Sequence, residues 1–135
     1  MRVIYNEQFW EYHSCLKAIF LADRIDEYGN VTWAVDEMIG SYDVESRIYK
    51  NDTYVIMHLG SFYINEKYRG KGYAHKMMDS VLEIAKINDV QEIELKIHNG
   101  NWVQQFYEKY GFVLDTENKC DDDRYSWMYK KMEIF

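Results

Sequence analysis

Apolar side chains repeat every three or four residues after Gly72, at Ala74, Met77, Met78, Val81, Leu82 and Ala85. An α-helix has a period of 3.6 residues, so this spacing places all six on one face and predicts a helix. Asn88 and Asp89 mark its end. Burial of each large side chain in such a stripe contributes about 1.5–3 kcal/mol, which favours a structural role over a cofactor-binding one.

Two further segments have the pattern of β-strands. Residues 92–98 (EIELKIH) alternate strictly, with Ile93, Leu95 and Ile97 on one face. Residues 53–64 (TYVIMHLGSFYI) form a long apolar run that contains Gly60. A glycine inside a strand often marks a bulge or the close approach of another backbone.

The N-terminal third is predicted as a short strand at residues 2–6 followed by helix, in one or two pieces, over residues 7–28. Its apolar positions fall near helical spacing, at Phe9, Tyr12, Leu16, Ile19 and Phe20, and Gly29-Asn30 is a stop signal. Residues 31–35 and 38–44 flank Asp36-Glu37 and predict a hairpin, and Lys50-Asn51-Asp52 predicts a turn.

The C-terminal part completes the expected order of elements. Residues 99–101 (NGN) predict a turn, 102–110 a short helix capped by Gly111, and 112–115 and 126–135 two strands joined by a polar loop. The order is strand, helix, hairpin, long strand, helix, strand, helix and two strands. It predicts one α/β (α+β) domain over residues 1–135, with helices on the faces of a central sheet.

The net charge limits the partners that we expect. The chain has 135 residues and a formal net charge of −7, which disfavours a nucleic-acid surface because phosphate binding needs a basic face. An acidic protein suits a cationic partner, although the charge can also serve solubility alone. Residues 66–76 depart from the trend with four Lys or Arg and one Glu, which suggests a site for an anionic ligand.

The expected location is the cytoplasm. No apolar run is long enough to span a membrane, and the first residues lack the apolar stretch of a signal peptide. Cys15 and Cys120 are far apart and form no CxxC motif, which is typical of free thiols in a reducing compartment.

A strand, a glycine-rich turn and a helix follow one another at YRGKGYAHKMM, residues 68–78. The first N–H groups of a helix have no partner within it, and the helix dipole adds positive charge there, so this arrangement can bind phosphate. Gly70 and Gly72 allow the backbone to approach a ligand closely. The stretch matches neither GxxxxGK[ST] nor GxGxxG, and a plain turn is the alternative interpretation.

Two motifs resemble those of the GNAT superfamily of N-acetyltransferases. Arg69 to Ala74 (RGKGYA) match its acyl-CoA-binding motif of Arg or Gln, any two residues, Gly, any residue, and Gly or Ala. Residues 99–112 (NGNWVQQFYEKYGF) resemble its later motif, and MYKKM at 128–132 its last strand. The resemblance covers residues 54–132 and implies a mixed, mostly antiparallel sheet, splayed in the middle and flanked by helices.

The resemblance also implies a site for acetyl-CoA as acyl donor, with no metal. Backbone groups of Phe62, Tyr63 and Ile64 would pair with the pantetheine arm. The pyrophosphate would be held by the N–H groups of Gly70, Lys71, Gly72, Tyr73, Ala74 and His75, with Arg69 or Lys71 reaching the phosphates. Many relatives carry an asparagine seven residues before the motif tyrosine; Gly100 occupies that position here, so Asn101 is the candidate, shifted by one residue.

Two proton-transfer roles follow from the resemblance. Tyr107 would protonate the leaving thiolate, and the alternative is that it only packs in the core. His58, on the long strand, is a candidate base because histidine as a residue type suits proton transfer at physiological pH. Glu66 and a water chain are the other candidates. A histidine without any catalytic role is the alternative at position 58.

The acceptor in this interpretation is a cationic amine. In the family the first helices and the loop between the last two strands shape the acceptor site; here these segments, residues 21–30 and 116–125, are acidic. They can steer a protonated amine, with stacking on Tyr28, Trp33 or Tyr125, or they can be solvated loops. A polyamine, an aminosugar and a lysine or N-terminal amine all remain open.

Two other functions and the oligomeric state also remain open. One alternative is a CoA-binding domain that senses acyl-CoA without transfer, and the other is an interaction module in which the glycine turn binds nothing. A homodimer through edge strands, with MEIF at 132–135 as the pairing segment, is a further expectation of the resemblance.

Overall fold

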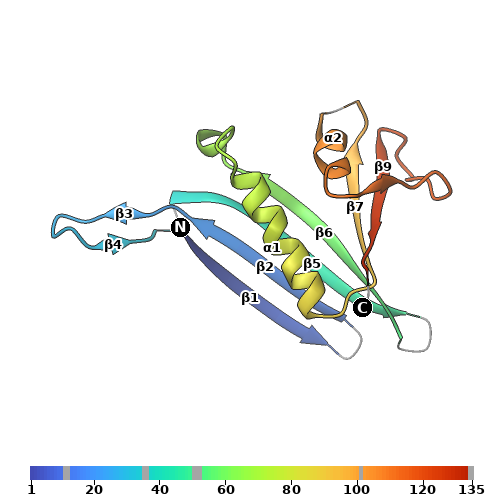
Figure 1. The fold of residues 1–135 in the computed structure, drawn as a ribbon, viewed down its shortest axis with the longest axis horizontal. Helices are drawn as coiled ribbons and strands as arrows, with labels where there is room; N and C mark the ends of the chain where they lie inside the picture. Colours follow the sequence, from blue (N-terminus) through green and yellow to red (C-terminus); the bar gives the residue numbers. More distant parts are fainter. Residues whose placement is uncertain (11–12, 35–36, 50–52, 101, 134–135) are drawn as a thin grey trace.

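A seven-stranded sheet in the order β1-β2-β5-β6-β7-β9-β8 forms the body of the protein in the computed structural model (Figure 1). The structure describes residues 1–10, 13–34, 37–49, 53–100 and 102–133. The strands are β1 (Arg2–Trp10), β2 (His13–Leu21), β5 (Met38–Tyr49), β6 (Tyr54–Ile64), β7 (Glu92–His98), β8 (Val113–Leu114) and β9 (Tyr125–Lys131). Among these described strands only β6 and β7 pair in parallel, so the predicted mixed, mostly antiparallel sheet is confirmed.

The prediction of a helix over residues 7–28 is wrong. β1 and β2 form an antiparallel pair that runs from Arg2 opposite Leu21 to Trp10 opposite His13. In β2 the buried positions alternate, with Ala18 and Phe20 in the core. The apolar residues of this segment fit a helical and a strand period equally well, and pairing with β5 decides between them.

The predicted hairpin of residues 31–35 and 38–44 is also wrong. β4 (Val31–Thr32) pairs instead with β3 (Arg24–Ile25), and β5 pairs with β2 and β6. Gly29-Asn30 is the turn of this small β3–β4 hairpin: the Asp26 carboxylate accepts from the N–H groups of Tyr28 at 2.9 Å and Asn30 at 2.8 Å. The turn predicted at 50–52 lies outside the described residues.

The elements predicted from the clearest periodicities are confirmed. β6 and β7 match residues 53–64 and 92–98, and α1 (Tyr73–Ile87) follows the glycine turn. Four residues of the predicted stripe are buried: Met77, Met78, Val81 and Ala85. α2 (Val103–Glu108) precedes Gly111, which adopts a φ of +89°. Neither helix has the length and apolar character needed to cross a bilayer in the described part of the chain.

Both helices lie on one face of the sheet, which we call the helix face (Figure 1). The core lies between them and strand residues such as Met57, Leu59 and Ile93. Strand side chains alternate between faces, so the opposite face, which we call the open face, carries other residues. No described helix covers it, and its side chains are half-buried or exposed; they include Asp43, Glu45, His58, Glu94, Lys96 and Trp127.

The sheet opens between β6 and β7. The two strands pair only from Ile56–Leu59 to Glu92–Leu95, and their C-terminal parts separate (Figure 1). At the opening, the register between β5 and β6 shifts at Gly60, and Ser61 has a φ of +51°. This predicted bulge adds one residue to β6 and turns Phe62 onto the helix face.

Candidate functional site

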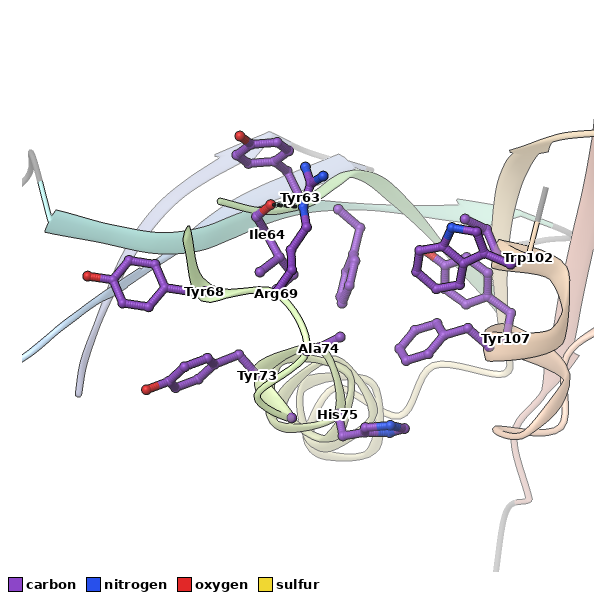
Figure 2. Close-up of a pocket in the computed structure, with 14 residues that line it drawn as sticks. Tyr63, Ile64, Tyr68, Arg69, Tyr73, Ala74, His75, Trp102 and Tyr107 are labelled. Carbon is purple, nitrogen blue, oxygen red and sulfur yellow. Dashed lines mark hydrogen bonds between the residues drawn. The ribbon is translucent and has the colours of Figure 1, made fainter. Parts of the chain in front are cut away.

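A pocket of about 590 Å³ fills the opening between β6 and β7 on the helix face (Figure 2). Its walls come from the end of β6, the glycine turn, the start of α1 and the face of α2. Most of the predicted cofactor-binding residues line it: Phe62, Tyr63, Ile64, Arg69, Gly70, Gly72, Tyr73, Ala74 and His75. Tyr107 lines it too, so the structure brings the two predicted motifs together at one cavity.

The glycine turn has the geometry of an anion site. Gly70 and Gly72 adopt φ values of +74° and +85°, which favour glycine, and a Cβ on either would meet nothing within 4 Å. Gly72 is the N-cap of α1, and the Lys76 N–H makes the first bond of the helical ladder, to the Gly72 carbonyl. The N–H groups of Tyr73, Ala74 and His75 therefore precede the ladder, and no acidic side chain lies in the first turn of this described helix.

The two cations of the motif have different surroundings. The Arg69 Nε donates to the Ile64 carbonyl at 2.9 Å, and its guanidinium lies 5.7 Å from the centre of the Tyr63 ring. Arg69 thus ties the glycine turn to the end of β6 while it lines the pocket. Lys71 does not line the pocket; its Nζ lies 5.9 Å from the centre of the Tyr68 ring.

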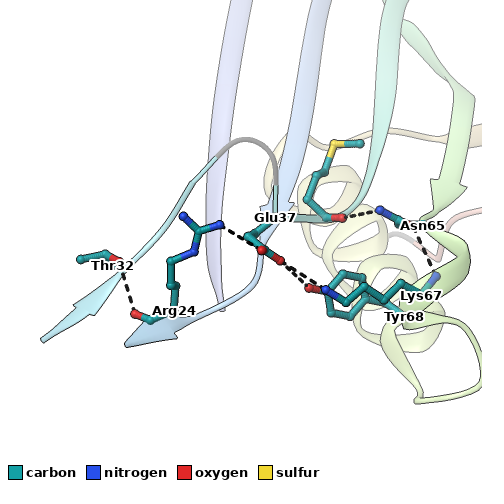
Figure 3. Close-up of polar contacts among 7 residues, drawn as sticks. Arg24, Thr32, Glu37, Asn65, Lys67 and Tyr68 are labelled. Atoms are coloured by element: carbon teal, nitrogen blue, oxygen red, sulfur yellow. Dashed lines mark hydrogen bonds and ion pairs between the residues drawn. The ribbon is translucent and has the colours of Figure 1, made fainter. Parts of the chain in front are cut away.

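Glu37 anchors the base of the glycine turn (Figure 3). Its carboxylate accepts from the Arg24 guanidinium at 2.9 Å and from the Tyr68 hydroxyl at 3.2 Å, and it lies 3.6 Å from the Lys67 ammonium. These contacts, those of Arg24 and Tyr68 first, lower the pKa of Glu37. The side chain of Asn65 also donates to the Met38 carbonyl, so the turn is fixed to the start of β5.

Tyr107 is buried at the pocket wall, with 6% of its surface exposed. Its ring packs on Phe62, Phe106 and Phe112, with ring centres 5.3–6.3 Å away. Burial raises the pKa of Tyr107 to about 12, so the hydroxyl stays protonated at neutral pH. This hydroxyl has no hydrogen-bond partner among the described residues, and a buried hydroxyl without a partner is a place where a ligand or water can bind.

Sequence reasoning missed part of the pocket wall. Trp102, Val103 and Phe106 on the N-terminal side of Tyr107, and Tyr68 before the turn, all line the cavity. The spacing of three and four residues to Phe106 and Tyr107 is the signal that could have identified the α2 residues, because such positions share a helix face.

A hydrogen bond joins the first turn of α1 to the segment just after α2. The His75 Nδ1 lies 2.6 Å from the Tyr110 hydroxyl, and the His75 ring centre is 5.4 Å from that of Phe106. The two helices that flank the pocket are therefore connected at its mouth.

The candidate bases lie away from this pocket. His58 is on the open face, with its Nδ1 3.4 Å from the Glu94 carboxylate and its ring edge-on to Trp127 at 5.8 Å. Glu66 is exposed in the 3₁₀ turn Glu66–Tyr68. Asn101, the candidate for the cofactor arm, lies outside the described residues.

The two acidic segments do not form one wall. Residues 21–30 include the first strand of the β3–β4 hairpin at one end of the molecule. Residues 116–125 form the loop between β8 and β9, together with the first residue of β9, at the other end (Figure 1). Several of their carboxylates have local partners: Asp26 closes the hairpin turn, and Asp122 pairs with Arg124 at 2.6 Å. The expected first helices are absent from the described residues, because β1 and β2 pair directly.

The comparisons with known proteins agree with this geometry. The family model described as an acetyltransferase (GNAT) domain matches residues 5–133. No curated protein matches the sequence.

Several solved structures share the fold. PaiA N-acetyltransferase from Thermoplasma acidophilum in complex with coenzyme A is 23% identical, with a TM-score of 0.56 over 90% of this chain and 62% of that one. An acetyltransferase from Streptococcus agalactiae is 19% identical, with a TM-score of 0.59 over 89% and 67% of the two chains. A chain of the NatC complex bound to Gag peptide and CoA is 17% identical, with a TM-score of 0.66 over 88% and 71%. The present chain thus spans 62% of the length of the Thermoplasma protein.

Proposed function

The chain belongs to the acetyltransferase (GNAT) domain family, and on this premise we propose that it transfers an acetyl group from acetyl-CoA to a primary amine. One observation carries the proposal. A single pocket is lined both by the glycine turn, where the first N–H groups of α1 are available to an anion, and by the buried Tyr107, whose hydroxyl has no partner among the described residues. The first feature suits the phosphates of CoA, and the second suits the sulfur that leaves during transfer.

Acetyl-CoA fits the residues of the pocket. The N–H groups from Gly70 to His75 would hold the pyrophosphate, in the space that a side chain at Gly70 or Gly72 would take. The end of β6 is not paired with β7, so its backbone groups can bind the amides of the pantetheine arm as a neighbouring strand would. The Tyr63 carbonyl lies toward Gly40 of β5, and the Ile64 carbonyl is already bonded to Arg69. The backbone groups of Phe62 and the Ile64 N–H are therefore the ones left for this pairing.

The reaction would proceed by direct attack. The amine nitrogen forms a bond to the thioester carbonyl, the carbon–sulfur bond breaks, and the Tyr107 hydroxyl donates to the leaving sulfur. A thiol has an ordinary pKa of about 8.5, below that of Tyr107, so the hydrogen bond to the developing thiolate is the main contribution. Burial against the same apolar wall would also raise the pKa of the CoA thiol, so the pKa values of the thiol and of Tyr107 would differ by less.

His58 is our candidate for the base that removes the proton from the amine. It lies on β6, on the face opposite the proposed CoA pocket, which is the side from which the amine would approach the opening. Its Nδ1 lies 3.4 Å from the Glu94 carboxylate, which can orient the ring. We expect a His58→Gln variant to lower kcat and to leave acetyl-CoA binding unchanged.

The function is tested by release of free CoA from acetyl-CoA. The panel of acceptors is spermidine, kanamycin, a peptide with one lysine and a blocked N-terminus, and a peptide with a free N-terminus and no lysine. We expect release that depends on one of these amine classes. Binding of acetyl-CoA without release above the no-amine control, for every acceptor, would favour the CoA-sensing alternative.

The anion site is tested by Gly72→Glu, which places a carboxylate where the pyrophosphate would lie. Gly29→Glu is a matched control, because Gly29 has a similar φ of +82° and open surroundings in the remote β3–β4 turn. We expect acetyl-CoA to raise the Tm of the wild type and of the Gly29→Glu variant, and to leave that of Gly72→Glu unchanged. Equal stabilisation of both variants would show that the phosphates bind elsewhere.

A further inference from the structure

The carboxylate of Asp43 on β5 lies beside the bulge of β6. Asp43 lies opposite Gly60, and a Cβ built on Gly60 would be only 2.8 Å from the Asp43 Oδ1. The same point is 3.7 Å from the Cδ2 of His58. The absence of a side chain at position 60 therefore makes room for the Asp43 carboxylate beside the candidate base.

This carboxylate differs from its neighbours because it forms no hydrogen bond or ion pair within the described part of the chain. Glu45, two residues along the same strand, accepts from Arg47 at 2.8 Å, and Glu94 lies beside His58. Lys17 is opposite Asp43 on β2, yet the two form no ion pair. A half-buried carboxylate that has no ion pair within the described residues can bind a cation from solution through charge-assisted hydrogen bonds.

Asp43 is also level with the point where the sheet opens. Leu59 and Leu95 are the last paired residues of β6 and β7, and Gly60 follows immediately. Asp43 approaches this point from the open face, while the proposed CoA pocket lies on the helix face. No described helix covers the open face, so a cationic group can reach the carboxylate from solvent.

We propose that Asp43 is the residue that binds the protonated acceptor amine, as an ion pair with a primary ammonium group, next to His58. The inference rests on the proposed function and names the acceptor subsite for it. Asp43 takes no part in proton transfer; it holds the ammonium at the opening, and the proton then passes from nitrogen to the base. A carboxylate selects for a positively charged acceptor and against an uncharged or anionic one.

The test is Asp43→Asn, which keeps the shape of the side chain and removes its charge. With the acceptor that supports CoA release, we expect KM for the amine to rise about 10- to 100-fold, the range of a lost charge-assisted hydrogen bond. We expect kcat to change less than threefold and KM for acetyl-CoA to stay the same. Glu45→Gln is the matched control: its carboxylate is on the same strand and face but is paired with Arg47, and KM should stay within twofold.

A second variant perturbs the same carboxylate from the other strand. Gly60→Ala places a methyl group 2.8 Å from the Asp43 Oδ1, so the carboxylate must move, and KM for the amine should rise again. An unchanged KM in Asp43→Asn, or an equal rise in Glu45→Gln, would overturn the proposal. Acetyl-CoA should raise the Tm of all three variants as it does that of the wild type, which shows that they are folded.

Calorimetric titration of the four panel amines into the CoA-loaded protein separates this proposal from the proposed function. If the wild type releases no CoA but binds an amine that Asp43→Asn binds at least tenfold more weakly, the ammonium site stands and the transfer activity fails. If the wild type transfers acetyl groups and both proteins bind the amine equally, the activity stands and the site fails. Absence of binding by the wild type for every amine would also overturn the site.

Discussion

Replacement of Tyr107 by phenylalanine tests whether the Tyr107 hydroxyl has a catalytic role or only a structural one. The ring packs on Phe62, Phe106 and Phe112, and the Tyr107→Phe variant keeps all of these contacts. The hydroxyl has no partner among the described residues, and a buried, unpaired polar group destabilises a protein by about 1–3 kcal/mol. We therefore expect the free energy of unfolding of Tyr107→Phe, without ligand, to equal or exceed that of the wild type.

The activity should change in the opposite direction. Loss of a positioned hydrogen-bond donor to the developing charge lowers kcat about 10²- to 10³-fold, which corresponds to about 2.7–4 kcal/mol of transition-state stabilisation. The dissociation constant of acetyl-CoA should change less than threefold, because the phosphates and the pantetheine arm contact other residues. A tyrosine that only packs would show no fall in kcat, whereas the gain in stability is expected for either role because it depends only on the unpaired hydroxyl.

The pH dependence of stability gives a third readout of the same residue. Burial raises the pKa of Tyr107 to about 12, against an ordinary value of about 10, so the folded state holds the proton more tightly. The contribution of the protonated Tyr107 to the free energy of unfolding is fully present below pH 10 and is lost as the pH rises through 12. The loss is about 2.7 kcal/mol, at 1.36 kcal/mol per pKa unit. The free energies of unfolding of the wild type and of Tyr107→Phe, measured with urea at each pH, should differ by an amount that changes with pH in this way.

The assay is initial-rate CoA release at saturating amine, with urea unfolding monitored by circular dichroism. Tyr28→Phe serves as the control, because Tyr28 is 81% exposed in the β3–β4 turn and lies far from the pocket (Figure 1). A wild-type kcat in Tyr107→Phe would refute the assignment of the proton donor. A loss of several kcal/mol of stability in that variant would refute the claim that its hydroxyl is unpaired.

Two other changes test how the pocket is held together. Gly40→Ala should lower the free energy of unfolding in urea by about 1–3 kcal/mol. The added Cβ would lie 2.4 Å from the Tyr63 carbonyl and 3.0 Å from the Met77 sulfur. An unchanged urea midpoint would show that β6 and α1 can move apart freely. Tyr110→Phe removes the 2.6 Å hydrogen bond to His75, so it should lower stability by about 0.5–1.5 kcal/mol and raise both the calorimetric Kd and the KM for acetyl-CoA. A fall in kcat alone in that variant would contradict a role at the pocket mouth.

The sequence determined the elements around the pocket because their local signals agree with their environment. In α1 the apolar stripe keeps the helical period of 3.6 residues from Ala74 to Ala85. In β7 the alternation of Ile93, Leu95 and Ile97 is strict. The turn at Gly70 and Gly72 could also be predicted without the tertiary structure, because glycine readily adopts the positive φ values that both residues have and that other residues rarely adopt. The pairing of the glycine turn with Tyr107 in one pocket followed from the two motifs and their resemblance.

The N-terminal strands needed the tertiary structure. Leu16, Ile19 and Phe20 fit the spacing of a helix, but Phe20 and Ala18 are buried with a period of two once β2 pairs with β5. Long-range pairing outweighs local propensity here, because β2 pairs with residues of β5 that lie 17–34 positions away along the chain.

Asp43 shows most clearly what only the fold decides. In the sequence it is one carboxylate among 23 Asp and Glu, without a motif around it. Its position depends on the register between β5 and β6, on the bulge at Gly60, and on the last paired residue of β7. Hydrophobic periodicity and helix signals are local and can be seen in a sequence, whereas the distance between a carboxylate and a strand opening depends on how separate strands pair.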